Sequence, residues 1–174
     1  LITDYSQMLK DEVALSKEKM KKIDLKLIVR SVVDDFNNIY QAKRGIQIIL
    51  KDKNNQDYFF INGIENRIEQ IIANLLDNSI SFSENNKKIL VELSKNEKGK
   101  IILKVIDEGK GFKETSTKKI FDRFYSNRPD NFGEHSGLGL NIVKNLVDLH
   151  GASISASNNI IQKGANVEII FPKT

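Results

Sequence analysis

ENRIEQIIANLLDNSIS, at residues 65–81, is the stretch of sequence that decides the fold. Isoleucine and leucine recur in it every three or four residues, which predicts a helix with one buried face. The residues of that face are Ile68, Ile72, Leu75 and Leu76. Asn74 and Asn78 stand four residues apart and therefore project from one face of the same helix. The segment thus combines a core-forming helix with a pair of polar side chains.

Helical and strand patterns alternate on both sides of this helix. Further helices are predicted at residues 1–21, 25–44 and 138–150, and strands at residues 46–50, 58–61, 89–93, 101–106, 152–157 and 165–171. Asp24 is expected to cap the helix at 25–44. The predicted buried face of that helix holds Leu27, Ile28, Val32, Phe36 and Ile39. Mixed strands with helices segregated to one side predict an α/β fold, a two-layer sandwich.

Between the strand at 101–106 and the helix at 138–150 the pattern fails. Residues 108–136 contain glycines, a polar run and one short amphipathic turn at 120–125. A connection of that length inside a compact domain is usually functional.

The composition is that of one globular domain. The 174 residues are 40% hydrophobic and 29% charged, with a net charge of +4. Cysteine is absent, which excludes disulfides and thiolate metal sites. The basic residues are scattered, so no nucleic-acid-binding stripe is predicted. The chain begins with Leu1 rather than Met, and we expect it to be a piece of a longer protein.

Residues 1–21 carry a sparse apolar stripe in a highly charged segment. A helix of this kind needs a partner helix to bury its apolar side chains. Two interpretations remain open: a helix that packs on its own domain, or the tail of a dimerising bundle.

Three polar clusters interrupt the apolar framework: Asn74 with Asn78, DEGKG at residues 107–111, and SGLGL at residues 136–140. Each has a simple structural explanation when taken alone, namely a solvated helix face, a glycine turn and a helix cap at Ser136. Taken together, they indicate a site for a nucleotide.

Each cluster suits one part of a magnesium–nucleotide complex. A glycine-flanked helix N-terminus presents free N–H groups to phosphate, and asparagine oxygens suit Mg²⁺. Asp107 at a strand end can accept a hydrogen bond from the amine of adenine, whereas the keto group of guanine would oppose it with a second acceptor. The glycine motifs of P-loop and dinucleotide-binding proteins do not occur in the sequence.

Four motifs in this order resemble those of bacterial sensor histidine kinases. NLLDNSISFS at residues 74–83 is similar to their N box, DEGKG at 107–111 to their G1 box, IFDRFY at 120–125 to their F box and SGLGL at 136–140 to their G2 box. The resemblance implies the Bergerat-type α/β sandwich that these kinases share with the gyrase, MutL and Hsp90 ATPases.

The resemblance also implies a division of the chain. Residues 24–174 are similar to the catalytic ATP-binding domain, and residues 1–23 resemble the C-terminal end of a helix from the dimerisation and phosphotransfer bundle. RFYSNRPD at residues 123–130 resembles the ChvG-like kinases of alphaproteobacteria.

The resemblance assigns a role to each motif residue. Asn78 would coordinate Mg²⁺, and Asn74 would assist at the phosphates. Asp107 would bind the adenine amine, while Gly109 and Gly111 would admit the ring. The backbone that meets the triphosphate would be that of Ser136, Gly137, Leu138 and Gly139.

Residues 110–135 would form a lid over the nucleotide. Phe121 and Phe124 would anchor this lid on the domain, and Arg123 or Arg128 would reach toward phosphate. We expect the lid to be variable in conformation without nucleotide, because its polar residues and glycines have little to bury.

The sequence departs from the family pattern in a few places. Ser81 stands where a basic residue commonly follows the N box, so one phosphate contact must be supplied elsewhere. His135 precedes Ser136 where a glycine often begins the G2 box, and it is expected to be an exposed lid residue. His150 lies at a helix end, where a structural role is expected. Neither histidine has the surroundings of a phosphoacceptor.

The implied function is that of a protein histidine kinase domain. It would transfer the γ-phosphoryl group of Mg²⁺–ATP to a histidine on a dimerisation domain that this fragment lacks, and would also bind ADP. The implied partners are that domain and a response regulator, in a homodimer, with no nucleic acid. The location would be the cytoplasmic part of a sensor kinase anchored in the inner membrane.

Three alternatives remain open at this stage. A hydrolytic ATPase of the same fold would use a glutamate at position 74 as general base, and Asn74 cannot accept that proton. A serine kinase of the anti-sigma-factor type would have no dimerisation bundle. An interaction module with a degenerate pocket would be expected to lack Asn78, Asp107 or the glycines.

Overall fold

The computed structural model describes residues 19–112, 118–121, 139–159 and 163–174. The strands in these parts are β1 (Lys21–Asp24), β2 (Gln47–Asp52), β3 (Phe60–Gly63), β4 (Lys88–Lys95), β5 (Ile101–Asp107), β6 (Ser153–Asn158) and β7 (Ala165–Phe171). The helices are α2 (Leu25–Arg44), α3 (Glu65–Ser81) and α4 (Gly139–Leu149), with a 3-10 turn η1 (Lys118–Phe121).

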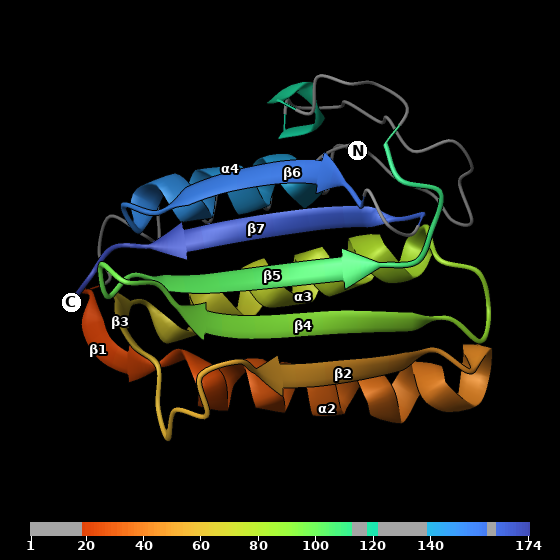
Figure 1. The fold of residues 1–174 in the computed structure, drawn as a ribbon, viewed down its shortest axis with the longest axis horizontal. Helices are drawn as coiled ribbons and strands as arrows, with labels where there is room; N and C mark the ends of the chain where they lie inside the picture. The colour runs from red at the N-terminus through yellow and green to blue at the C-terminus, as the bar shows by residue number, and fades with distance from the viewer. Residues whose placement is uncertain (1–18, 113–117, 122–138, 160–162) are drawn as a thin grey trace.

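The main sheet has five strands in the order β2-β4-β5-β7-β6. β2 pairs with β4 in parallel, and the other neighbours pair antiparallel. In Figure 1, α2, α3 and α4 all lie behind this sheet, so the helices cover one face of it. The predicted two-layer α/β sandwich is confirmed.

The core lies between the sheet and the helices because successive side chains of a strand point to opposite faces. In β5, Ile101, Leu103 and Val105 are buried, whereas the residues between them are half-buried. α3 packs against β5 from the helical side. The predicted inward face of α3 is confirmed, since each of its members is at most 2% exposed: Ile68, Ile72, Leu75 and Leu76.

The predicted ends of α2 are confirmed. Asp24 Oδ1 accepts a hydrogen bond of 3.1 Å from the Lys26 N–H and caps the first turn. Gly45 follows the last turn with φ of 65°, a left-handed conformation that glycine adopts without strain.

The predicted buried face of α2 is wrong in part. Leu27 is 61% exposed and Ile39 is 46% exposed. Leu27 lies roughly 200° around the helix from Leu25, which is fully buried, because each residue turns a helix by about 100°. The buried residues of α2 are Leu25, Ile28, Val29, Val32 and Val33.

The helix predicted over residues 1–21 is wrong at its C-terminal end. Lys19 and Met20 are not helical, and β1 begins at Lys21. β1 pairs antiparallel with β3, placing Ile23 opposite Ile61, so this short stretch joins a two-stranded sheet of its own. Residues 1–18 lie outside the described residues.

The remaining elements lie close to their predicted positions. The strand predicted at 58–61 is β3, which begins and ends two residues later and pairs with β1 rather than in the main sheet. The amphipathic turn predicted at 120–125 overlaps η1 at Ile120 and Phe121, and its later residues lie outside the described part. No helix in the described parts of the chain is long and apolar enough to span a membrane.

Candidate functional site

One end of the sandwich collects most of the predicted site residues that the structure describes. β5 ends there at Asp107, α4 begins there at Gly139, β6 ends there at Asn158 and β7 begins there at Ala165 (Figure 1). α3 runs toward the same end and carries Asn74 and Asn78 in its second half. The fold therefore brings the end of β5, the start of α4 and the adjoining ends of β6 and β7 to one end of the sandwich.

Asp107 is a buried, hydrogen-bonded polar residue of this end. It is only 2% exposed, and its Oδ1 accepts hydrogen bonds from the N–H groups of Gly109, at 2.9 Å, and Ala165, at 3.1 Å. Two backbone donors thus fix the orientation of one buried carboxylate. Such an acceptor is suited to recognising a donor on a flat ligand that reaches the strand end.

The glycines after Asp107 allow the backbone to turn tightly. Gly111 has φ of 79°, and a Cβ on it would lie 2.6 Å from Asn158 Oδ1 and 3.2 Å from Gly164 O. Any other residue here would be strained and would displace its neighbours. Gly139 differs, because a Cβ built on it meets no atom of the described residues within 4 Å at the start of α4.

Asn74 and Asn78 are both half-buried, while Leu75 and Leu76 between them are buried. The pair therefore lies at the border between the core face of α3 and the surface. The described residues contain no group of three or more His, Cys, Asp or Glu side chains that could hold a metal ion.

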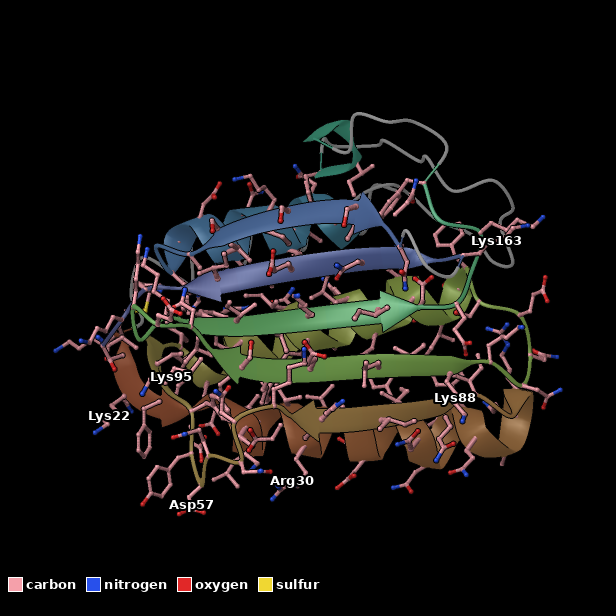
Figure 2. The ribbon with its side chains drawn as sticks, in the orientation of Figure 1. Lys22, Arg30, Asp57, Lys88, Lys95 and Lys163 are labelled. Atoms are coloured by element: carbon pink, nitrogen blue, oxygen red, sulfur yellow. The ribbon has the colours of Figure 1, made fainter. Side chains whose placement is uncertain are left out.

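A cavity of about 330 Å³ opens beside the segment that follows β5. Its lining residues are Phe82, Glu84, Lys87, Glu108, Gly109, Lys110 and Lys163. Lys163 is labelled in Figure 2 at the end of the sheet where β7 begins. Three lysines and two glutamates give this cavity a mixed, slightly positive border next to Gly109.

The first part of the predicted F box is held against α4. Ile120 and Phe121 are 2% and 7% exposed, and Phe121 O accepts a 3.0 Å hydrogen bond from Asn141 Nδ2. Phe121 is thus packed on the domain, in line with its predicted role as an anchor. The other residues predicted for this region lie outside the described part of the chain: Arg123, Phe124, Arg128, His135, Ser136, Gly137 and Leu138.

The sequence did not predict that residues between and at the ends of β6 and β7 contact Asp107. Ala165 supplies one of the two donors to Asp107. A Cβ on Gly164, which has φ of 145°, would clash with Asp107 O well inside van der Waals distance. Gly164 in a polar connection was the one available signal, and a glycine there indicates only a turn until its neighbour in space is known.

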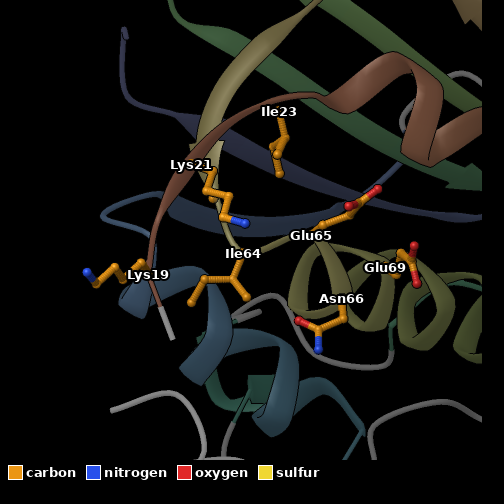
Figure 3. Close-up of a pocket in the computed structure, with 8 residues that line it drawn as sticks. Lys19, Lys21, Ile23, Ile64, Glu65, Asn66 and Glu69 are labelled. Carbon is orange, nitrogen blue, oxygen red and sulfur yellow. The ribbon is translucent and has the colours of Figure 1, made fainter. Parts of the chain in front are cut away.

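A second cavity, of about 370 Å³, lies at the opposite end of α3 (Figure 3). Lys19 and Lys21 approach it from one side, and Glu65 and Glu69 belong to α3 on the other. None of the residues predicted for the nucleotide site lines it.

His150 has the structural role that was predicted for it, and it lies near this second cavity. It is 5% exposed, its Nε2 accepts a hydrogen bond of 3.1 Å from the Ile64 N–H, and its Nδ1 donates to Leu146 O at 2.7 Å. Burial lowers the pKa of His150 below its ordinary value of 6.5, although the bond to Leu146 O opposes this shift. The ring is therefore neutral and joins α4 to the start of α3.

Comparisons with known proteins agree with this geometry. Residues 63–174 match the family described as histidine kinase-, DNA gyrase B-, and HSP90-like ATPase. The sensor protein ChvG of Agrobacterium fabrum is 34% identical over 170 residues, which are 94% of this chain and 28% of that protein. The sensor protein kinase PmrB of Pseudomonas aeruginosa is 27% identical over 90% of this chain and 32% of its own length.

Solved structures show the same fold. The catalytic domain of histidine kinase ThkA superposes with a TM-score of 0.77 at 24% identity, over 90% of this chain and 99% of that one. The mycobacterial sensor histidine kinase MprB superposes with a TM-score of 0.73 at 22% identity, over 88% and 97% of the two chains.

The chain belongs to the histidine kinase-, DNA gyrase B-, and HSP90-like ATPase family, as the catalytic ATP-binding domain of a two-component sensor histidine kinase. It spans less than a third of the length of the ChvG proteins that it matches.

Proposed function

We propose that this domain binds Mg²⁺–ATP at the end of the sandwich that holds Asp107, and transfers the γ-phosphoryl group to a histidine on the dimerisation domain of the same kinase. The observation that carries the proposal is the buried Asp107 carboxylate, oriented by the N–H groups of Gly109 and Ala165. ADP is the expected product and a second ligand.

Adenine recognition follows from the chemistry of Asp107. An ionised carboxylate only accepts hydrogen bonds, so it favours the amine of adenine and disfavours the keto oxygen of guanine. Gly109 is buried beside it and Gly111 has a backbone that only glycine adopts easily, which suits a flat ring lying against the chain.

The asparagine pair fits Mg²⁺. This ion keeps most of its waters and needs few protein oxygens beside those of the phosphates, so one amide oxygen, that of Asn78, is compatible with it. When bound, the ion neutralises charge on the phosphates. Asn78 would hold it and Asn74 would contact the phosphates.

Phosphate binding at the start of α4 remains a proposal based on sequence and on the position of Gly139. Among the described residues nothing lies within 4 Å of a Cβ built on Gly139 at this helix N-terminus, where backbone N–H groups favour anions. Ser136, Gly137 and Leu138 would extend this contact, and Arg123 or Arg128 would add a positive charge in place of the basic residue that Ser81 replaces.

The reaction breaks the bond between the γ-phosphorus and its bridging oxygen to ADP and forms a bond from that phosphorus to a histidine nitrogen. The domain contributes by positioning the nucleotide and stabilising its charge. Asn74 has no basic atom with which to activate water, so hydrolysis of ATP is disfavoured.

The proposed protein partners are the dimerisation domain, whose end residues 1–23 resemble, and a response regulator. ThkA, which shares this fold at 24% identity with a TM-score of 0.76, was solved in complex with the response regulator protein TrrA. We place the domain on the cytoplasmic side of a membrane-anchored homodimeric kinase, as for sensor proteins of this kind.

Phosphoryl transfer in a reconstituted system tests the proposal. The chain, mixed with γ-labelled ATP, Mg²⁺ and the dimerisation domain of its own kinase, should label a histidine and give an acid-labile, base-stable product. The chain alone should not label itself, and it should release no more than a trace of phosphate. Strong labelling of serine or threonine, or fast hydrolysis without a partner, would point to the serine kinase or to the ATPase instead.

A further inference from the structure

Asn158, the last residue of β6, binds the backbone of Phe112 through both ends of its side-chain amide. Its Oδ1 accepts a hydrogen bond of 2.6 Å from the Phe112 N–H, and its Nδ2 donates to Phe112 O at 3.0 Å. One side chain thus pairs with one residue as a neighbouring strand would. Phe112 itself is 5% exposed, so this pairing fixes a buried point of the chain.

The pairing holds the far end of the segment that begins at Asp107. Asn158 lies opposite Ala165 in the ladder between β6 and β7, and the Ala165 N–H donates to Asp107 Oδ1 at 3.1 Å. This pair of facing residues therefore forms hydrogen bonds with both ends of the segment 107–112: Ala165 with Asp107, and Asn158 with Phe112.

Gly111 is fitted to the same side chain. A Cβ on Gly111 would stand 2.6 Å from Asn158 Oδ1, so the asparagine oxygen occupies the space that a larger residue would need. The glycine and the asparagine together set the path of the backbone where the adenine ring is proposed to lie.

We propose that Asn158 is a positioning residue for nucleotide binding, an inference that rests on the proposed ATP site. Asn158 acts through Phe112. Its two bonds to Phe112 hold the backbone from Gly109 to Gly111 in the position in which a base could reach the Asp107 carboxylate. Without it, the Phe112 end of the segment loses two backbone hydrogen bonds, and both the affinity for ATP and the preference for adenine fall.

The chain contains a matched control for this role. Asn37 of α2 pairs with Ile48 of β2 in the same two-bonded way, with Nδ2 donating to Ile48 O at 2.9 Å and Oδ1 accepting from the Ile48 N–H at 2.8 Å. β2 and β6 are the opposite edge strands of the main sheet. The two asparagines thus make equivalent bonds, but those of Asn158 hold Phe112 in the segment after β5, whereas those of Asn37 hold β2, which β4 separates from β5.

Isothermal titration of the chain with Mg²⁺–ATP and Mg²⁺–GTP tests the inference on Asn158→Ala and Asn37→Ala. Both variants are expected to unfold at lower denaturant concentration than the parent chain. Only Asn158→Ala should weaken ATP binding, by about tenfold, the change that one or two neutral hydrogen bonds produce. The ratio of ATP to GTP affinity should fall in the same variant. Asn37→Ala should keep both affinities within about twofold.

A purely structural role gives a different result. Partial unfolding lowers the fraction of molecules that bind but leaves the affinity of the folded fraction unchanged, and titration measures these two quantities separately. If Asn158→Ala does not fold, Asn158→Asp with Asn37→Asp replaces the pair, because aspartate keeps the acceptor and loses the donor in both places.

The outcomes separate the two proposals. A parent chain that binds no adenine nucleotide overturns the proposed function and this inference with it. A parent chain that binds ATP, with Asn158 variants that bind it equally well and keep the preference for adenine, overturns the role of Asn158 alone.

Discussion

The Ala165 N–H donates to Asp107 Oδ1 at 3.1 Å although the two residues are 58 positions apart in the chain. Asp107 ends β5, and Ala165 begins β7, which pairs with β5 in the main sheet. The bond therefore exists only when β7 has docked in register, because a one-residue shift of β7 would point a different group at the carboxylate. Folding of the sheet and assembly of the proposed base-recognition group are one event.

Replacing Asp107 by Ala should weaken ATP binding by about 1–3 kcal/mol, the cost of losing a charged hydrogen-bond acceptor. The same change should reduce the preference for ATP over GTP, because the group that disfavours the keto oxygen is gone. Isothermal titration with both nucleotides measures the two effects. Lys95→Ala is a suitable control, since Lys95 lies at the opposite end of the sheet from Lys163 (Figure 2). Equal ATP and GTP affinities in the parent chain would contradict the assignment.

Replacing Asn78 by Ala should remove the Mg²⁺-dependent part of nucleotide binding. We expect ATP affinity in the presence of Mg²⁺ to fall by at least about tenfold, while binding without the metal changes little. Asp77→Ala tests the neighbouring, exposed carboxylate of the same helix and should have a small effect. Retention of full Mg²⁺ dependence in Asn78→Ala would argue that another group holds the ion.

Alanine at Gly164 should destabilise the domain, whereas alanine at Gly139 should not. At Gly164 the new Cβ clashes with the backbone of Asp107 at a φ of 145°, so we expect a loss of roughly 2 kcal/mol or more. At Gly139 the Cβ meets no atom of the described residues within 4 Å, and stability should hold or rise by up to about 1 kcal/mol.

Urea unfolding measures these changes, and titration with ATP adds a second comparison. Gly139→Ala should bind ATP more weakly in spite of its stability, because the space that the Cβ fills is proposed to receive phosphate. An equally stable Gly164→Ala would show that the turn between β6 and β7 can move away from Asp107.

The stability of the domain should fall as the pH drops below about 6.5, because the pKa of His150 is lowered by burial in the folded chain. The unfolded chain takes up a proton on this residue near pH 6.5, whereas the folded chain does so only at lower pH. The contribution of His150 is complete above pH 6.5 and is lost between that value and the lowered pKa.

Unfolding in urea between pH 5.5 and 8 measures this dependence. His150→Gln removes the titrating group, so its free energy of unfolding should vary less over this range than that of the parent chain. A protonated ring would present an N–H to the N–H of Ile64, which is why the folded state resists protonation. Identical pH profiles for the two chains would mean that other groups control the dependence.

Local sequence was sufficient to predict α3, because its apolar spacing coincides with the face that meets the sheet. It was insufficient for β1, since Lys-Lys-Ile-Asp has little strand character of its own and extends only because β3 pairs with it. Leu27 was misplaced for a related reason: an apolar side chain in a helix need not lie on the face that the sheet covers.

For the site, the sequence predicted residues that are proposed to touch the nucleotide. It did not predict the residues that form hydrogen bonds with them or with their segment. Asp107, Gly111 and Asn78 belong to short motifs whose spacing is visible in one segment. Ala165 and Asn158 act on residues far away in the chain, and nothing in their immediate neighbours indicates this.

The Asp107 carboxylate is already immobilised before any ligand is present. Ordering a free side chain at an interface costs about 0.5–1.5 kcal/mol of conformational entropy, and folding has removed that freedom here through the bonds to Gly109 and Ala165. The base recognition that we propose for Asp107 would then need no rearrangement of its acceptor. Any conformational-entropy cost of nucleotide binding should therefore arise in other parts of the domain.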